Sequence, residues 1–263
     1  MKKKLPALFL TLAMILSLAA CGSTGKNEDV ELIVFAAASL TETMDQVIEN
    51  YKTAVPSVTI IPNYDSSGAL LTQIQSGAVC DLFLSAAPKQ MDTLDEEGLL
   101  LEDTRLDLLE NKVALAVPEG NPKGIESFDQ LAQLLKDNDI FLAIGNSDVP
   151  VGQYTQKIFA HYELDEETLA ANGLLTYGSN VKEVTTQVTE ATVDCGIIYA
   201  TDAFSANLTT VDGATAEICG QVIYPAAVIG TTEHPGEAQA FLEYLTTSAA
   251  SDIFASVGFT PLT

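Results

Sequence analysis

The sequence has no tryptophan, two histidines and few positive charges, with 12 Lys and Arg against 36 Asp and Glu in 263 residues and a formal net charge of −24. Contacts to nucleic-acid phosphates need a basic patch, so this shortage of Lys and Arg argues against a nucleic-acid partner. It does not exclude an anionic ligand, because neutral hydroxyl and amide donors can hold an anion inside a closed cleft.

Catalytic and metal-binding motifs are also lacking. The sequence has no GxSxG, Walker A or HExxH pattern, and His161 and His234 stand in polar surroundings away from any nucleophile motif. The acidic clusters at 92–97 and 163–167 lack the spacing of a calcium loop and are typical of solvated helix faces. We therefore expect no enzymatic activity, no cofactor and no direct protein–metal ligands.

The sequence contains four cysteines, and none stands in a CxxC or Cys/His spacing, so a zinc site is not indicated. At least one of Cys80, Cys195 and Cys219 stays unpaired or pairs between molecules, because their number is odd. A Cys195–Cys219 disulfide is one alternative. Simple burial is the interpretation we favour, since cysteines inside apolar runs are usually buried.

Only one hydrophobic run is long, and it lies at the N-terminus. Lys2, Lys3 and Lys4 precede an apolar stretch over 5–20 that ends at Leu18-Ala19-Ala20-Cys21. This pattern predicts a signal peptide over 1–20, and its removal would change the net charge from −24 to −27, because three lysines and no acidic residue are lost. The residues around Cys21 resemble the bacterial lipobox, which implies lipid attachment at Cys21 and a flexible tether over 21–29.

The alternative is an ordinary secretory signal followed by a chance cysteine. No later segment is long enough to span a membrane. We therefore expect the mature chain at the extracytoplasmic face of the cell membrane, held there by lipid alone.

Beyond the tether, short apolar runs alternate with longer amphipathic ones, a pattern typical of an α/β fold with open, mainly parallel sheets. The expected buried strands are 31–37, 58–61, 81–85, 113–117, 140–144 and 196–199. The expected helices are 40–54, 70–76, 88–97, 128–136, 153–162, 182–189, 237–246 and 249–256, with Gly77 and Gly98 as C-terminal caps of two of them.

Two stretches, 111–117 and 221–229, could pass from one lobe to another. Pro225 lies inside the second, and a proline within a strand pattern favours an edge or connecting strand over a central one. If both stretches cross, the first lobe comprises 30–112 plus 224–263 and the second comprises 113–223.

Small, hydroxyl-bearing or Pro/Gly residues recur at four junctions between a strand and a helix, at 39–42, 66–69, 149–152 and 181–184. Ligands bind at the carboxyl ends of strands in open α/β sheets, and helix N-termini there favour anions. The structural alternative is plain capping: Ser39 with Glu42 forms a capping box in sequence, Ser66 could be an N-cap, and Pro150 could be a first-turn proline. The residues alone leave both interpretations open.

Seven blocks of the sequence resemble, in order, the motifs of the periplasmic molybdate-binding proteins, which are the substrate-binding components of molybdate ABC importers. The blocks span nearly all of the mature chain and are 34–40, 66–68, 77–86, 149–154, 196–203, 224–228 and 258–259. The resemblance implies an α/β, two-lobed periplasmic-binding-protein fold of type II, in which each lobe is an open mixed sheet flanked by helices. It also implies a molybdate or tungstate oxyanion in the cleft between the lobes, delivery to a membrane permease, and a monomeric protein.

Carried over residue by residue, the resemblance assigns five donors to the oxyanion. They are the hydroxyls of Ser39, Ser67 and Tyr199 and the main-chain N–H groups of Val151 and Val181. Two positions depart from the family pattern, since Val151 replaces a smaller residue after the proline and Gly68 replaces a third serine. Both roles are main-chain or peripheral, so we expect the ligand class to be retained.

The chemistry of the ligand agrees with such a site. A tetrahedral dianion offers only acceptors, and hydrogen bonds to a charged acceptor are stronger than neutral ones. A protonated ligand such as hydrogen phosphate would bring a donor with no acceptor to meet it, which is penalised in a closed site. Two alternatives remain: a binding protein for another tetrahedral oxyanion such as sulfate, and a surface adhesin or sensory lipoprotein. The second would not need donor-rich helix starts.

Overall fold

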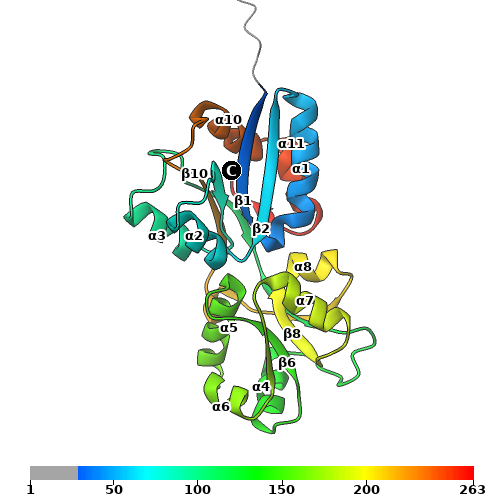
Figure 1. Cartoon of the computed structure of the whole chain (residues 1–263). Helices are drawn as coiled ribbons and strands as arrows, with labels where there is room; N and C mark the ends of the chain where they lie inside the picture. The colour runs from blue at the N-terminus through cyan, green and yellow to red at the C-terminus, as the bar shows by residue number, and fades with distance from the viewer. Residues whose placement is uncertain (1–28) are drawn as a thin grey trace, which may run out of the picture.

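The computed structural model describes residues 29–263 and forms two lobes, which lie one above the other in Figure 1. The predicted signal peptide and Cys21 lie outside the described residues. Within residues 29–263, no helix combines the length and the apolar character that crossing a membrane requires.

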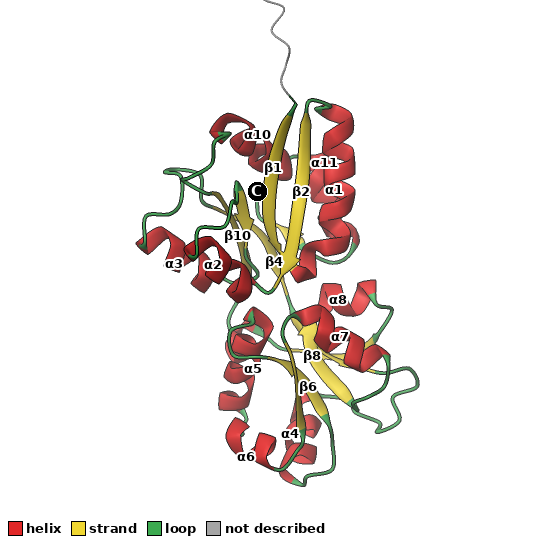
Figure 2. Cartoon of the chain, in the orientation of Figure 1, coloured by secondary structure: helices red, strands yellow, loops and turns green. Residues whose placement is uncertain are grey.

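The first lobe is built on a six-stranded sheet with the order β11-β4-β10-β3-β1-β2. Its strands are β1 (Val30–Ala37), β2 (Val58–Asp65), β3 (Leu82–Leu84), β4 (Leu106–Asn111), β10 (Val222–Val228) and β11 (Thr260–Pro261). Its helices are the short 3-10 helix η1 (Ala38–Leu40), α1 (Thr41–Ala54), α2 (Ser67–Gln75), α3 (Pro88–Glu96), α10 (Pro235–Leu245) and α11 (Ser248–Ser256). Helices cover both faces of this sheet, as Figure 2 shows.

The second lobe is built on a five-stranded sheet with the order β7-β6-β8-β5-β9. Its strands are β5 (Val113–Val117), β6 (Leu142–Gly145), β7 (Leu175–Gly178), β8 (Cys195–Tyr199) and β9 (Thr209–Gly213). Its helices are α4 (Phe128–Lys136), α5 (Pro150–His161), α6 (Glu166–Ala171), α7 (Val181–Thr189), α8 (Ala200–Ser205) and α9 (Ala216–Cys219).

Strand β1 explains why the apolar run after the tether becomes a central strand. Leu32, Val34 and Ala36 point into the core that contains α1 and α10, while Phe35 points into the core under α2 and α3. A strand that is buried on both faces needs a continuous apolar run rather than an alternating one. β1 pairs in parallel with β2 on one side and with β3 on the other, so it is a central strand of the sheet.

The mixed character of both sheets is confirmed, but the expectation of mainly parallel strands is wrong. Among the pairings of the described strands, four are parallel and five are antiparallel. The antiparallel pairs involve β4, β5 and β10, which lie where the chain passes between the lobes. β4 ends at Asn111 and β5 begins at Val113, so a single residue connects a strand of the first sheet to a strand of the second.

Pro225 lies in a strand that connects the two lobes, as one of the two expected alternatives, but this strand is central and not at the edge of its sheet. β10 is hydrogen-bonded to β3 on one side and to β4 on the other, and its register against β4 shifts between Tyr224 and Pro225. This irregularity resolves the conflict, because a bulge is a place where a strand can accommodate a residue without an N–H donor.

Local predictions at the helix ends are confirmed. Gly77 and Gly98 follow α2 and α3 with φ of 83° and 67°, the left-handed conformation that glycine adopts without strain at a helix C-terminus. Cys80, Cys195 and Cys219 are buried and form no disulfide, as the preference for simple burial predicted.

Candidate functional site

The carboxyl ends of strands from both lobes meet around one small cavity between the lobes. Its volume is about 10 Å³, which corresponds to about one water-sized sphere. The lining residues from the first lobe are Ala37, Ala38, Ser39, Ser66, Ser67 and Ala86, and those from the second are Val149, Pro150, Val151, Val181 and Tyr199. All five residues predicted to hold a ligand therefore line the same cavity.

Ser39 does not cap a helix. It lies in η1, directly after β1, and α1 begins two residues later without any side-chain cap, so the capping box with Glu42 does not form. The buried Ser39 Oγ instead lies 2.9 Å from the phenol oxygen of Tyr224.

Ser66 and Ser67 have separate roles at the start of α2. Ser66 is the N-cap, and its Oγ accepts a hydrogen bond from the Ala69 N–H at 3.2 Å. The capping interpretation therefore holds for Ser66. Ser67 is fully buried, and its Oγ accepts from the Ala86 N–H at 2.9 Å. The hydroxyl hydrogen of Ser67 is therefore available to another acceptor.

The second lobe contributes the first turns of two helices. Val151 follows Pro150 at the start of α5, and Val181 is the first residue of α7. N–H groups in the first turn of a helix have no intrahelical acceptor and carry the positive end of the helix dipole. In α7 the side chain of Asn180 caps the N–H of Glu183, and Val181 lines the cavity.

Tyr199 ends β8 and is buried. Its hydroxyl group makes no hydrogen bond within the described residues, although a buried polar group without a partner is costly. Burial raises the pKa of the Tyr199 phenol well above its ordinary value of 10.0, so the group stays protonated and can act as a donor. An acceptor in the cavity would satisfy it.

Among residues 29–263, no lysine or arginine lines the cavity. Lys182 stands beside Val181 on α7, but its ammonium group is paired with Glu42 at 2.7 Å and with Asp202 at 2.9 Å. The positive charge nearest in sequence to the cavity lining is thus matched by two carboxylates. The cavity itself offers neutral hydroxyl and amide donors.

Asp202 is fully buried in α8, and neither of its oxygens accepts a well-aligned hydrogen bond from the described residues. Burial raises its pKa from 3.8 to about 6, and the opposing attraction of Lys182 does not overcome this effect. The Asp202 carboxyl has a higher pKa in the folded protein than in the unfolded chain, so it stabilises the folded protein below pH 4. This contribution is lost as the pH rises to about 6.

We expect this loss to appear when the wild-type protein is compared with Asp202→Asn. The melting temperature of the wild type, relative to that of the variant, should fall between pH 4 and pH 6 and should be constant above pH 7. Asp252→Asn, on the exposed side of α11, is the control and should show no such trend. A difference between wild type and Asp202→Asn that does not change with pH would contradict the assignment.

The lobes touch across the cavity. The Asn180 side chain donates to Asp65 at 3.3 Å, and Lys182 of the second lobe pairs with Glu42 of the first. Gly68 on α2 approaches the second lobe so closely that an added Cβ would lie 2.2 Å from the backbone oxygen of Asp148. The structure therefore describes a closed arrangement of the two lobes.

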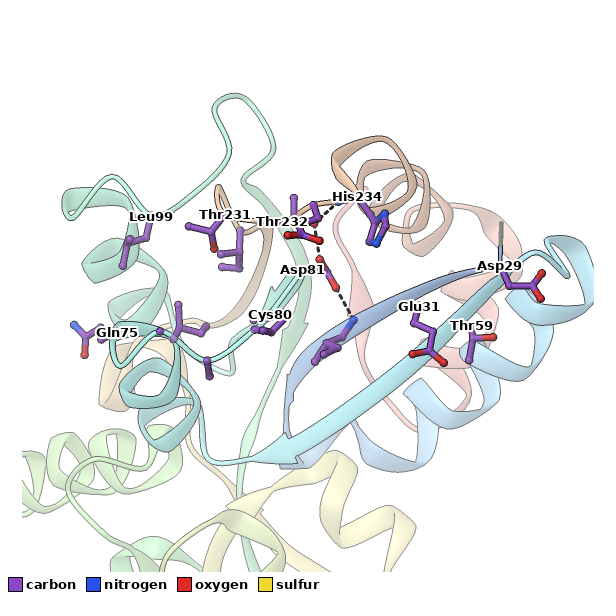
Figure 3. A pocket seen from close by; sticks show the side chains of 17 residues that line it. Asp29, Glu31, Thr59, Gln75, Cys80, Asp81, Leu99, Thr231, Thr232 and His234 are labelled. Carbon is purple, nitrogen blue, oxygen red and sulfur yellow. Dashed lines mark hydrogen bonds between the residues drawn. The ribbon is translucent and has the colours of Figure 1, made fainter. Parts of the chain in front are cut away.

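A larger hollow lies in the first lobe, away from the cleft. Figure 3 shows this hollow, of about 990 Å³, with Asp81 held by the Thr232 hydroxyl and the Ile33 N–H. Its other acidic side chains include Asp29 and Glu31, which would repel an anion. The residues that the structure describes contain no group of three or more His, Cys, Asp or Glu arranged to hold a metal ion.

Several residues of this region have contacts that the sequence did not predict. Tyr224 contacts Ser39, and Asn111 contacts Tyr224. Asp148 approaches Gly68. The two residues of each pair are far apart in sequence. Tyr224 lies within one of the blocks that resemble the molybdate-binding proteins, and this was the one available signal. The other contacts depend on how the two lobes close.

Comparison with known proteins agrees with this geometry. Residues 32–260 match the family described as bacterial extracellular solute-binding proteins. The chain belongs to this family. Its members include substrate-binding proteins of ABC transporters, and this chain is one of them.

Three similar proteins place the chain more closely. YvgL of Bacillus subtilis (strain 168), provisionally named an ABC transporter substrate-binding lipoprotein, is 33% identical and covers 99% of both chains. The molybdate-binding protein ModA of Haemophilus influenzae is 30% identical and covers 87% of this chain and 89% of its own. The structure of the periplasmic molybdate-binding protein of Azotobacter vinelandii matches with a TM-score of 0.76 at 21% identity, covering 87% of this chain and 98% of that one, which shows the shared fold. The resemblance and the two-lobed type II fold are thereby confirmed.

Proposed function

We propose that this protein captures molybdate, and also tungstate, in the closed cavity between its lobes and delivers it to the permease of an ABC importer. Ser39, Ser67 and Tyr199 bind the oxyanion through their hydroxyl groups, and Val151 and Val181 bind it through their main-chain N–H groups. The 30% identity to a named molybdate-binding protein supports the choice of ligand.

The observation that carries the proposal is the buried Tyr199 hydroxyl, which has no well-aligned acceptor among the described residues and lies in a cavity that Ser39, Ser67, Val151 and Val181 also line. A tetrahedral dianion has acceptors on every side and suits such a set of donors. Closing the lobes removes water and strengthens each of these bonds.

Selection between oxyanions follows from size and protonation. Sulfate and molybdate are both tetrahedral dianions at neutral pH, so charge does not separate them. Molybdate is larger, and donors fixed in two closed lobes fit one radius best. Hydrogen phosphate brings a hydrogen that these donors cannot accept.

The proposal is tested by the melting temperature of the mature protein with a panel of oxyanions. Molybdate and tungstate at micromolar excess should raise it clearly, since a ligand at a hundred times its dissociation constant stabilises the folded state by about 2.7 kcal/mol. Sulfate and phosphate at the same concentration should have little effect. A larger shift with sulfate or phosphate would move the protein to that ligand class, and no shift with any oxyanion would defeat the proposal.

We also propose that the chain is a lipoprotein anchored at Cys21, on the basis of the sequence Leu18-Ala19-Ala20-Cys21 and of the name of YvgL. Cys21→Ala should abolish metabolic labelling with palmitate, because the thiol that carries the lipid is gone. Secreted, unlabelled protein or unprocessed precursor is the expected product. Labelling that persists in this variant would disprove the anchor.

The division of the chain between the lobes is part of the same proposal. Residues 30–112 plus 224–263 form the first lobe and residues 113–223 form the second, so that the chain crosses twice. Strand pairing supports two crossings, because β4 and β10 pair in the six-stranded sheet while β5 pairs in the other, although Val222 and Ile223 already pair with β4 in the first sheet.

A further inference from the structure

A chain of buried hydrogen bonds runs from the point where the lobes join to Ser39. Asn111, the last residue of β4, donates through Nδ2 to the Tyr224 hydroxyl at 3.2 Å and to Thr201 Oγ1 at 2.9 Å. The Tyr224 oxygen lies 2.9 Å from Ser39 Oγ. All four residues are buried, and only Ser39 lines the cavity.

The direction of this chain is fixed at its Asn111 end. The Oδ1 atom of Asn111 accepts from the Lys112 N–H at 2.8 Å, so its Nδ2 atom must face Tyr224 and Thr201. The two hydrogens on Nδ2 serve these two oxygens. Because Asn111 is the donor, the Tyr224 oxygen is the acceptor in that bond.

The hydrogen of the Tyr224 hydroxyl then needs an acceptor of its own. Ser39 Oγ lies 2.9 Å from the Tyr224 oxygen and can accept this hydrogen, and the Tyr199 hydroxyl also lies near Tyr224 but makes no well-aligned hydrogen bond among the described residues. A buried hydroxyl hydrogen without an acceptor costs about 1–3 kcal/mol, so Tyr224 donates to Ser39. Burial raises the pKa of Tyr224 well above 10.0, which keeps this hydrogen in place.

The consequence for Ser39 is that its own hydrogen is not used by Tyr224 and remains available to the cavity. The hydroxyl hydrogen of Ser67 is available in the same way, because the Ser67 Oγ accepts a hydrogen bond from the Ala86 N–H. Both serines therefore accept from the protein on one side. Each keeps its hydroxyl hydrogen for the other side.

We propose that Tyr224, oriented by Asn111, is a positioning residue that directs the hydroxyl hydrogen of Ser39 toward the bound oxyanion. Tyr224 and Asn111 do not line the cavity, so they act through Ser39 and not on the ligand. The inference rests on the proposed function, since it assumes that Ser39 donates to an oxyanion. Aligned hydrogen bonds polarise one another, and this strengthens the final bond to the ligand.

Tyr224→Phe tests the proposal, because it removes the hydroxyl group and keeps a ring that packs edge-on against Tyr199 and Phe259. We expect the dissociation constant for molybdate, measured by calorimetry, to rise about three- to tenfold. In a Ser39→Ala background the same substitution should cause no further rise, because its effect passes through the Ser39 hydroxyl. Asn111→Leu should behave in the same way and serves as the second variant if Tyr224→Phe does not fold.

Tyr154→Phe is the matched control. Tyr154 also packs against the Tyr199 ring, but its hydroxyl faces the Gln221 carbonyl and not Ser39. Its effect on affinity should be the same with and without Ser39. A loss in Tyr224→Phe that is equally large in both backgrounds, or no loss at all, would overturn the inference. Failure of the wild-type protein to bind any oxyanion would instead defeat the proposed function.

Discussion

Replacing Gly68 by alanine should weaken molybdate binding about a hundredfold while leaving the ligand-free fold intact. The family pattern has a serine at this position, so the expected effect comes from the close approach of Asp148 to Gly68 in this chain and not from a general need for glycine. The added Cβ would lie 2.2 Å from the Asp148 backbone oxygen, whereas an ordinary contact needs at least 3.4 Å. Gly68 belongs to the first lobe and Asp148 to the second, so the clash can be relieved by holding the lobes apart. Lobes that are held about 1 Å further apart cannot both form hydrogen bonds of about 2.9 Å to the same ligand.

The size of the effect follows from the bonds that would be lost. One or two hydrogen bonds to a charged acceptor contribute about 1.5–3 kcal/mol each, and every 1.4 kcal/mol is a tenfold change in affinity. The helix itself should not suffer, because alanine is a better helix former than glycine by up to about 1 kcal/mol. The melting temperature without ligand should therefore be unchanged or slightly higher.

Gly236→Ala provides a closely matched control. Gly236 is the second residue of α10, as Gly68 is the second residue of α2, and an added Cβ at Gly236 would meet no heavy atom within 4 Å. Calorimetry should show wild-type affinity for Gly236→Ala and a large loss for Gly68→Ala. Equal affinities in the two variants would mean that the ligand-bound protein does not close as this structure does.

Ser39→Ala and Ser67→Ala should each weaken molybdate binding about ten- to a hundredfold. Each substitution removes one hydrogen bond to a charged acceptor, which contributes about 1.5–3 kcal/mol. Each also leaves a buried donor of the protein without its acceptor, the Tyr224 hydroxyl in one case and the Ala86 N–H in the other. A modest decrease in the ligand-free melting temperature should accompany the loss of affinity.

Ser76→Ala is the control for these two variants, since Ser76 follows α2 and its hydroxyl bonds only to the exposed end of that helix. Calorimetric titration of the three variants with molybdate gives the comparison directly. Wild-type affinity in both Ser39→Ala and Ser67→Ala would show that the ligand lies elsewhere in the protein.

Local sequence patterns predicted much of this structure, because the burial of a strand and the end of a helix depend mainly on residues that are close in sequence. The apolar run of β1 became a strand buried on both faces, and Gly77 and Gly98 adopt the left-handed conformation after their helices. The two junctions of each lobe also came together, because the carboxyl ends of parallel strands meet at one edge of a sheet. For Ser39, however, the capping box in the sequence was misleading, since its hydroxyl bonds to a residue 185 positions away.

Features that depend on long-range contacts could not be predicted in this way. The proline in β10 suggested an edge or connecting strand, and its central place in the sheet depends on the bulge beside Tyr224, which the local pattern did not show. The approach of Gly68 to Asp148 depends on the relative position of two lobes, which no local pattern encodes. The same is true of the bond between Asn111 and Tyr224, whose partners lie 113 residues apart.

The most direct test of the central claim is a crystal of the mature protein with molybdate, with diffraction measured at the molybdenum absorption edge. The anomalous map should show one strong peak in the cavity between the lobes, with oxyanion oxygens within about 3 Å of Ser39, Ser67, Tyr199 and the N–H groups of Val151 and Val181. A peak in the hollow beside Asp81, a peak on the surface, or no peak in a crystal soaked at saturating molybdate would contradict the account.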